Sequence, residues 1–161
     1  MLKLLNLVEF FVLLEYRIIN SRLLNMRKSI TQEFDYGCGI ACYAFALNIS
    51  YKEAERILGP EQSASTRFWV KDLTQKLNQA GLKYSSRHLN QTLKKQIYND
   101  GTIVLIRRSK KYIAGHYLIR HEGVWMDPWI NMPNDNNIGN AKSGFRKRLP
   151  GSPMYALFPE K

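Results

Sequence analysis

The segment QEFDYGCGIACYAFAL, residues 32–47, contains both cysteines of the chain. Cys38 lies between Gly37 and Gly39, directly before an apolar run that predicts a buried helix. A cysteine at a helix N-terminus is surrounded by unpaired backbone N–H groups, which favour the nucleophilic thiolate and can stabilise an oxyanion. Cys42 lies one turn further along, where a thiol is typically a small core residue. We therefore expect Cys38 to be a nucleophile and Cys42 to be a packing residue.

Gln32 precedes Cys38 by six residues and carries a side-chain amide. An amide N–H can donate to the same developing oxyanion as a backbone N–H at the helix start. The sequence therefore predicts Gln32 as the second donor of an oxyanion hole. Asp35 lies between the two residues, and we expect it to cap the helix rather than take part in the chemistry.

A thiol nucleophile also needs a base that a further group orients. Of the three histidines, His116 has the most suitable surroundings. It opens the segment HYLIR (residues 116–120), which is followed by a Glu-Gly turn and by VWMD (residues 124–127). If the turn has two residues, His116 and Asp127 are diagonal neighbours on one face of a hairpin, about 7 to 8 Å apart. We therefore expect Asp127 to orient His116.

The chain resembles the papain-like cysteine peptidases, most closely the bacteriocin-processing double-glycine leader peptidases and their stand-alone relatives. Four elements in the same order carry this resemblance: Gln32, Cys38 followed by glycine, His116 within GHYLIR, and Asp127 within MDPW. It covers about residues 32–128. It implies Cys38 as nucleophile, His116 as general base and then acid, and Asp127 as the third member of a catalytic triad.

The resemblance further implies Gln32 as the oxyanion donor, a bacterial thiol protease of the hydrolase class, and no cofactor. The spacing of the histidines and cysteines does not match a metal site. The implied fold is papain-like, of the α+β class, with N-terminal helices packed on a C-terminal antiparallel sheet.

The local patterns predict the same fold class independently. Helices are expected over residues 38–47, over a segment capped by Ser50 and stopped by Gly59, over about 66–80, and around an apolar series ending near residue 99 (Leu89, Leu93, Ile97). Strands are expected from alternating or apolar runs at 82–87, 102–106, 116–120, 124–127 and 154–158. Helices followed by antiparallel strands indicate an α+β domain.

The formal net charge is +11, from 24 Lys and Arg against 13 Asp and Glu. The basic clusters RRSKK (residues 107–111) and FRKRLP (residues 145–150) are short and are expected to be exposed loops. This favours solvated loops or attraction to an acidic partner over nucleic-acid binding. The partner we expect is a peptide or protein substrate. Two cysteines four residues apart offer no bridge between distant segments, which favours a reducing compartment.

Residues 1–25 are interpreted as an N-terminal amphipathic extension, outside a peptidase domain over residues 26–161. Apolar residues recur near helical spacing, so this stretch is expected to pack on the domain, on a partner or peripherally on a membrane surface. Charged residues interrupt it and no cleavage site follows, which argues against a signal peptide or a membrane span. A start at Met26 is the alternative. The expected location is the cytoplasm, with export as an effector as the alternative.

These observations predict a stand-alone cysteine peptidase that hydrolyses a peptide or isopeptide bond through an acyl-enzyme on Cys38. Two alternatives stay open. The same triad supports a thiol-dependent acyltransferase or deamidase, because those reactions share the thioester intermediate. A papain-like fold without activity can also be a binding module, with the basic loops as its interface.

Overall fold

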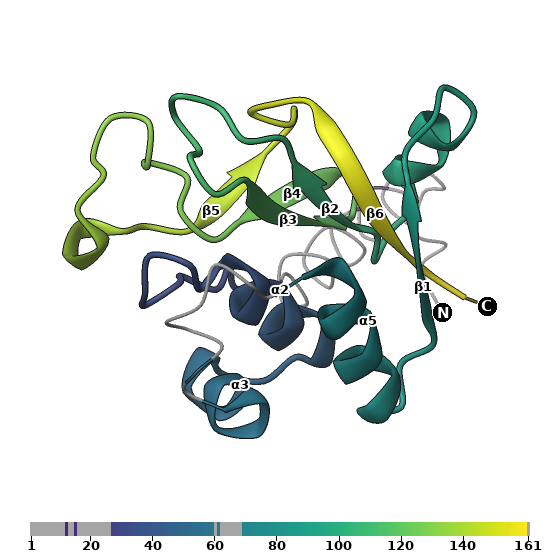
Figure 1. Ribbon diagram of the computed structural model, residues 1–161, viewed down its shortest axis with the longest axis horizontal. Coiled ribbons are helices and arrows are strands. Elements are labelled where there is room, and N and C mark those ends of the chain that lie inside the picture. Colours follow the sequence, from purple (N-terminus) through teal and green to yellow (C-terminus); the bar gives the residue numbers. More distant parts are fainter. Residues whose placement is uncertain (1–11, 13–14, 16–26, 60, 62–68, 161) are drawn as a thin grey trace, which may run out of the picture.

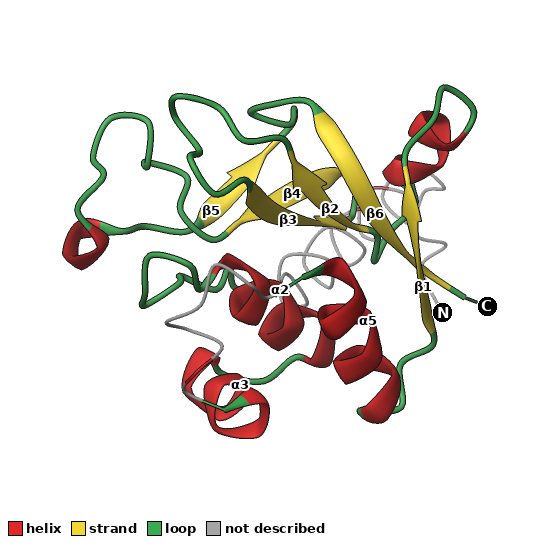
Figure 2. Ribbon diagram, viewed as in Figure 1, coloured by secondary structure: helices red, strands yellow, loops and turns green. Residues whose placement is uncertain are grey.

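A computed structural model describes residues 12, 15, 27–59, 61 and 69–160 of the chain. The predicted extension, residues 1–25, lies outside the described residues except for Val12 and Glu15, so its role stays a prediction. Helices α2 (Cys38–Leu47), α3 (Tyr51–Leu58) and α5 (Val70–Gln79) lie on one side of an antiparallel sheet (Figures 1 and 2). No helix in the described part of the chain has the length and apolar character needed to cross a membrane.

The helices follow the expected pattern of apolar residues. Helix α2 is buried on all sides from Gly39 to Phe45, and it packs between strand β3 and helix α3. Helix α3 begins after Ser50, whose side chain accepts the Glu53 N–H, and ends at Gly59. Helix α5 buries one apolar stripe (Val70, Leu73, Leu77). Of the helix predicted over about 66–80, residues 66–68 lie outside the described residues.

The described residues form a six-stranded antiparallel sheet in the order β1-β6-β2-β3-β4-β5. Its strands are β1 (Tyr84–His88), β2 (Ile103–Ile106), β3 (His116–His121), β4 (Val124–Asp127), β5 (Gly144–Arg146) and β6 (Pro153–Pro159). The face toward the helices contributes apolar side chains to the main core (Ile103, Tyr117, Ile119, Met126, Leu157). The opposite face carries a second, smaller core (Val104, Leu118, Trp125, Ala156). The predicted α+β class is confirmed.

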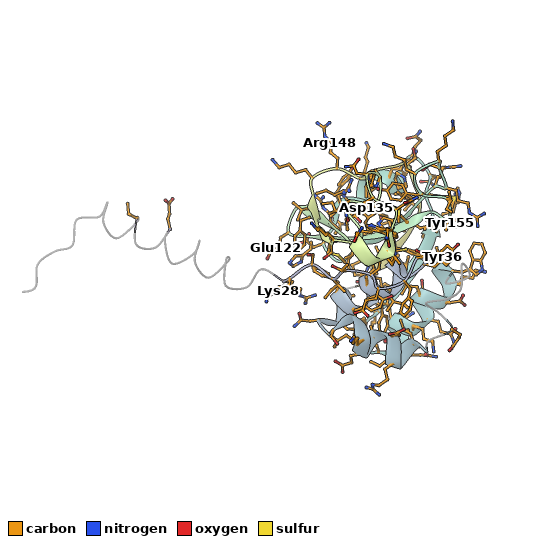
Figure 3. The ribbon with its side chains drawn as sticks, turned by 90° about the vertical axis from the view of Figure 1, so that its left-hand side faces the viewer. Lys28, Tyr36, Glu122, Asp135, Arg148 and Tyr155 are labelled. Carbon is orange, nitrogen blue, oxygen red and sulfur yellow. The ribbon has the colours of Figure 1, made fainter. Side chains whose placement is uncertain are left out.

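The hairpin between β3 and β4 has the predicted register. Ile119 pairs with Met126 and His121 pairs with Val124, which leaves a two-residue turn at the edge of the molecule, where Figure 3 labels Glu122. Both turn residues have positive φ, 44° at Glu122 and 80° at Gly123, as the favoured two-residue hairpin turn requires. This register places the beginning of β3 beside the end of β4.

Two predictions about local structure are wrong. The helix expected around Leu89 to Ile97 is a short 3-10 helix, η1 (Leu93–Tyr98), in which only Ile97 is buried. Leu89, Leu93 and Ile97 all pack in the second core, but Leu89 directly follows strand β1, which leaves too short a segment for a stable α-helix. The cluster FRKRLP, expected to be a loop, begins within strand β5. That strand is only three residues long, so its sequence contains too little alternation to be recognised.

Candidate active site

Cys38 is the first residue of α2, and Gly37 is the N-cap. The first N–H groups of a helix have no partner within it, so they surround the Cys38 side chain with hydrogen-bond donors. The prediction that Asp35 caps this helix is wrong, because no side chain accepts a capping hydrogen bond there. Asp35 lies two residues before the N-cap and is exposed to solvent.

His116 is the first residue of β3, and its side chain is only 1% exposed. Its Nε2 atom lies 2.7 Å from Oδ1 of Asp127. The preceding residue, Gly115, has a φ of +79°, and a Cβ there would approach the Ile106 carbonyl oxygen to 2.8 Å. Glycine is therefore needed at this position, because it lets the loop enter β3 close against the backbone of β2.

The second ring nitrogen of His116 faces the nucleophile. Since Nε2 is engaged by Asp127, Nδ1 is the atom left for the hydrogen bond with the Cys38 side chain. Burial lowers the pKa of His116, but the hydrogen bonds to Asp127 and Cys38 outweigh it and raise this pKa to about 9. His116 is therefore set up to hold a proton at neutral pH, between the thiol and the carboxylate.

Asp127 ends β4 and is fully buried. Its Oδ1 accepts hydrogen bonds from His116 and, at 2.9 Å, from the backbone N–H of Trp129. Its Oδ2 forms an ion pair with Nε of Arg146 at 2.8 Å. Burial raises the pKa of this carboxyl, but His116, the Trp129 N–H and Arg146 together lower it below its ordinary value. Asp127 is therefore an ionised carboxylate whose two oxygens are both engaged.

Arg146 belongs to β5 and was not anticipated as a site residue. It pairs with Trp125 across the sheet, which makes it a diagonal neighbour of Asp127 on the same face. Its Nη2 also donates to the Ile130 carbonyl oxygen at 3.1 Å. In the sequence, Arg146 belongs to the cluster FRKRLP, which is expected to be an exposed loop, so nothing there indicates a contact with Asp127.

Two buried aromatic residues contact the His116–Asp127 pair. The Tyr112 ring stacks on the imidazole of His116, with a centroid distance of 5.0 Å and an interplanar angle of 22°. Trp129 is also buried, and it contacts Asp127 through its backbone N–H. Tyr112 was not anticipated, because it lies in a loop between two strands and no local pattern links it to His116.

Gln32 is buried near the entry to α2. Its Nε2 donates to the carbonyl oxygens of Phe34 and Asp35 at 2.8 and 3.1 Å, and its backbone N–H donates to the Pro128 carbonyl oxygen at 3.2 Å. Gln32 therefore ties the loop before Cys38 to the segment after β4. Both amide hydrogens are in use, so donation to an oxyanion requires the release of one of these bonds. The oxyanion role stays a prediction.

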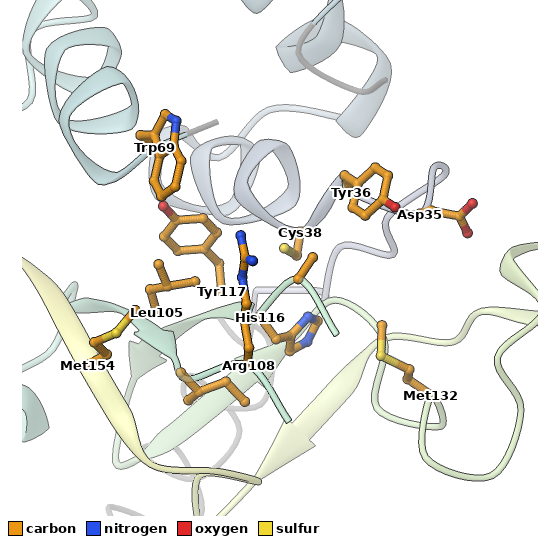
Figure 4. A pocket seen from close by; sticks show the side chains of 13 residues that line it. Asp35, Tyr36, Cys38, Trp69, Leu105, Arg108, His116, Tyr117, Met132 and Met154 are labelled. Carbon is orange, nitrogen blue, oxygen red and sulfur yellow. The ribbon is translucent and has the colours of Figure 1, made fainter. Parts of the chain in front are cut away.

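Two adjoining cavities flank the site. Figure 4 shows the smaller one, about 70 Å³, with Cys38 on its helix side and His116 on its sheet side. The larger cavity, about 580 Å³, extends toward the segment after β4 and includes Trp129. The two share part of their lining (Asp35, Tyr36, Ala114, Gly115, Met132). Together they extend from Cys38 and His116 to the segment after β4.

Cys42, one turn further along α2, lies away from this space. It is fully buried in the main core. Burial, together with the nearby Cys38 and Asp127, raises the pKa of its thiol well above the ordinary value. Cys42 is an apolar packing residue, as predicted.

No protein-family model matches the sequence, and no curated protein matches it. Among solved structures, the chain is similar to the peptidase domain of Streptococcus ComA, a bifunctional ABC transporter involved in a quorum-sensing pathway. The TM-score is 0.53 and the sequence identity is 15%, over 83% of this chain and 98% of that domain. At 15% identity, this similarity is evidence about the fold alone. It confirms the predicted papain-like α+β architecture, while the catalytic roles of the four site residues stay predictions.

Proposed function

We propose that this protein is a cysteine peptidase that hydrolyses a peptide or isopeptide bond through an acyl-enzyme on Cys38. One observation carries the proposal. Cys38, at the open end of α2, lines the same cavity as His116, whose other nitrogen is hydrogen-bonded to the buried Asp127. The similarity to a peptidase domain supports the same reaction class.

In the first half of the reaction, His116 carries the proton of the Cys38 thiol on Nδ1, and the thiolate sulfur attacks the carbonyl carbon of the substrate. The oxygen of the tetrahedral intermediate is stabilised by the backbone N–H groups at the start of α2, with the Gln32 amide as the second donor. The imidazolium of His116 then protonates the leaving amine as the C–N bond breaks. The product is a thioester on Cys38 and a free amine.

In the second half, His116 takes a proton from water, and the resulting hydroxide attacks the thioester. The C–S bond breaks, the acid product leaves, and the proton taken from water stays on His116 beside the regenerated Cys38 thiolate. Asp127 remains ionised throughout, because its partners hold its pKa below the ordinary value. Its charge keeps the imidazole in the required orientation and stabilises the imidazolium.

For the substrate class, we propose a peptide or protein chain. The likeness to a peptidase domain supports this choice.

The test compares wild type with Cys38→Ala on a peptide library, with cleavage products identified by mass spectrometry. Cleavage by wild type and by a Cys42→Ala control, but not by Cys38→Ala, is the expected result. Products without cleavage, either with an added amine joined to the peptide or with glutamine converted to glutamate, would identify an acyltransferase or a deamidase. Absence of turnover, together with a folded protein whose Cys38 is not labelled by a thiol-directed probe, would favour a binding module.

A further inference from the structure

The loop between β2 and β3, residues 107–115, carries a basic cluster directly beside the candidate site. Arg108 lines the smaller cavity, and Lys110 and Lys111 line the larger one. All three residues are exposed to solvent. Figure 4 shows Arg108 in the same view as Cys38 and His116. The positive charges therefore border the space that a substrate would occupy.

This loop is held in a defined position relative to the nucleophile. The Ser109 N–H donates to the Tyr112 carbonyl oxygen at 2.9 Å, and the Tyr112 N–H donates to the Ser109 hydroxyl at 3.1 Å. Gly115 also donates to the Tyr112 carbonyl oxygen, at 3.0 Å. Since the Tyr112 ring is buried against His116, the turn that carries the lysines is anchored on the catalytic histidine itself.

The charge around the two cavities is unbalanced. Asp35 is the one carboxylate among the described residues that line them, against three cationic side chains on the loop. The larger cavity also offers apolar surface, from the buried Trp129, from Met132, and from Ile113, which is 74% exposed. Its lining is therefore apolar in part and basic along the loop.

We infer that the substrate segment seated in the larger cavity carries an acidic side chain that pairs with Lys110 and Lys111, next to an apolar side chain. This rests on the proposed peptidase function, because the larger cavity adjoins the smaller one, which Cys38 lines. Exposed rim charges act mainly by steering association and by modest pairing, so their effect decreases with ionic strength. A peptide fits this surface better than a nucleic acid does, because the charges border two adjoining cavities, one of which is lined by Cys38.

The test uses a library peptide that wild type cleaves, prepared with glutamate or with glutamine at each position within four residues of the cleaved bond. At low salt, wild type should prefer glutamate on one side of the bond by about 2- to 10-fold in kcat/KM, mostly through KM. The double variant Lys110→Glu/Lys111→Glu should lose or reverse this preference and retain kcat on the glutamine peptide. Raising the salt concentration should reduce the preference of wild type.

The matched control is Lys94→Glu/Lys95→Glu, which makes the same change in net charge. These adjacent lysines are exposed on η1 and line neither cavity. The control should keep the wild-type preference for glutamate. An equal loss of preference in the control would contradict a local site, because net charge alone would then explain it.

A binding measurement separates this inference from the proposed function. In Cys38→Ala, fluorescently labelled glutamate and glutamine peptides should differ in Kd by the same factor, and adding Lys110→Glu/Lys111→Glu should remove the difference. Equal cleavage and equal binding of the two peptides would overturn the inference and leave the peptidase proposal intact. If wild type cleaves no library peptide, preferential binding of glutamate-containing library peptides that depends on Lys110 and Lys111 would overturn the peptidase proposal alone. Tighter binding of a single-stranded oligonucleotide that depends on Lys110 and Lys111, with no preference between the peptides, would assign the loop to nucleic acid instead.

Discussion

The two cysteines of α2 lie one helical turn apart in opposite surroundings. Cys38 is partly exposed at the helix start, lines a cavity and is hydrogen-bonded to His116. Cys42 is fully buried in the core, where burial raises the pKa of its thiol well above the ordinary value. The same residue type thus has two roles, and the difference comes from the position along one helix. Unpaired N–H groups are available only at its beginning.

This contrast divides the helix into an end that supports chemistry and an end that supports the fold. Around Cys38, polar groups from β3, β4 and β5 converge through His116, Asp127 and Arg146. Around Cys42, the neighbours belong to the apolar core. Substitutions near the first cysteine should therefore change the rate more than the stability, and substitutions near the second should do the reverse.

Among the residues around the nucleophile, the largest effect is expected for Asp127→Asn. The histidine loses the charge that sets its tautomer and stabilises its cation, so kcat should fall on the order of 10²- to 10⁴-fold. The protein should still fold, since asparagine keeps the oxygen that accepts the Trp129 N–H. Steady-state kinetics and circular dichroism measure both effects. Near-normal turnover in a folded variant would remove Asp127 from the mechanism.

Gln32→Ala should lower kcat by about 100-fold, equivalent to roughly 3 kcal/mol of transition-state stabilisation, with a smaller rise in KM. The loop before Cys38 also loses its hydrogen bonds to Gln32, which should cost about 1 to 2 kcal/mol in the free energy of unfolding. Steady-state kinetics measure the change in kcat, and urea unfolding measures the change in stability. A loss of stability with kcat unchanged would leave Gln32 as a loop anchor only, and a change in KM alone would make it a substrate-binding residue.

Much of this site could be predicted because its signals are local. The glycines around Cys38 mark a helix start, and the two-residue turn fixes the register that brings His116 to Asp127. Arg146 and Tyr112 were missed for the opposite reason. Each reaches the site through tertiary contacts, one from a three-residue edge strand and the other from a loop. No periodicity in the sequence reports such contacts.

Arg146→Gln should lower kcat by roughly 10-fold, because Asp127 loses the partner of its second oxygen and holds His116 less firmly. The side chain of Arg146 is 21% exposed, so the stability cost is expected to be only about 1 to 3 kcal/mol at neutral pH. Arg148→Gln is the matched control, since Arg148 is exposed at the surface (Figure 3). Equal kinetics in both variants would contradict a positioning role for Arg146.

The pH dependence of stability tests the ion pair between Arg146 and Asp127. Arg146 helps to lower the pKa of Asp127 in the folded state. The stability difference between wild type and Arg146→Gln should therefore be fully present above the unfolded-state pKa of about 3.9. It should be lost as the pH falls through the lower folded-state pKa. Urea unfolding at several pH values measures this, and a difference that persists at the lowest pH would assign it to packing instead.

The smallest effect on rate is expected for Cys42→Ala. This variant should keep most of the activity, within about 2-fold, because Cys42 is buried in the main core and lines neither cavity of the site. It should lose about 1 to 2 kcal/mol of stability through the small cavity left in the core. Thermal unfolding measures the loss of stability, and steady-state kinetics measure the activity that remains. A large loss of activity without loss of stability would mean that the second cysteine also takes part in the chemistry.

The most direct test of the contrast between the two cysteines is limited alkylation of the native protein with iodoacetamide at neutral pH, followed by peptide mapping. Cys38 should react first, and activity should fall in step with its labelling, because its sulfur lines the cavity beside His116. Cys42 should remain unmodified until the protein is unfolded, because its thiol is buried and its pKa is raised. Label on Cys42 in the native protein, or full activity after complete alkylation of Cys38, would contradict the assignment of Cys38 as the nucleophile.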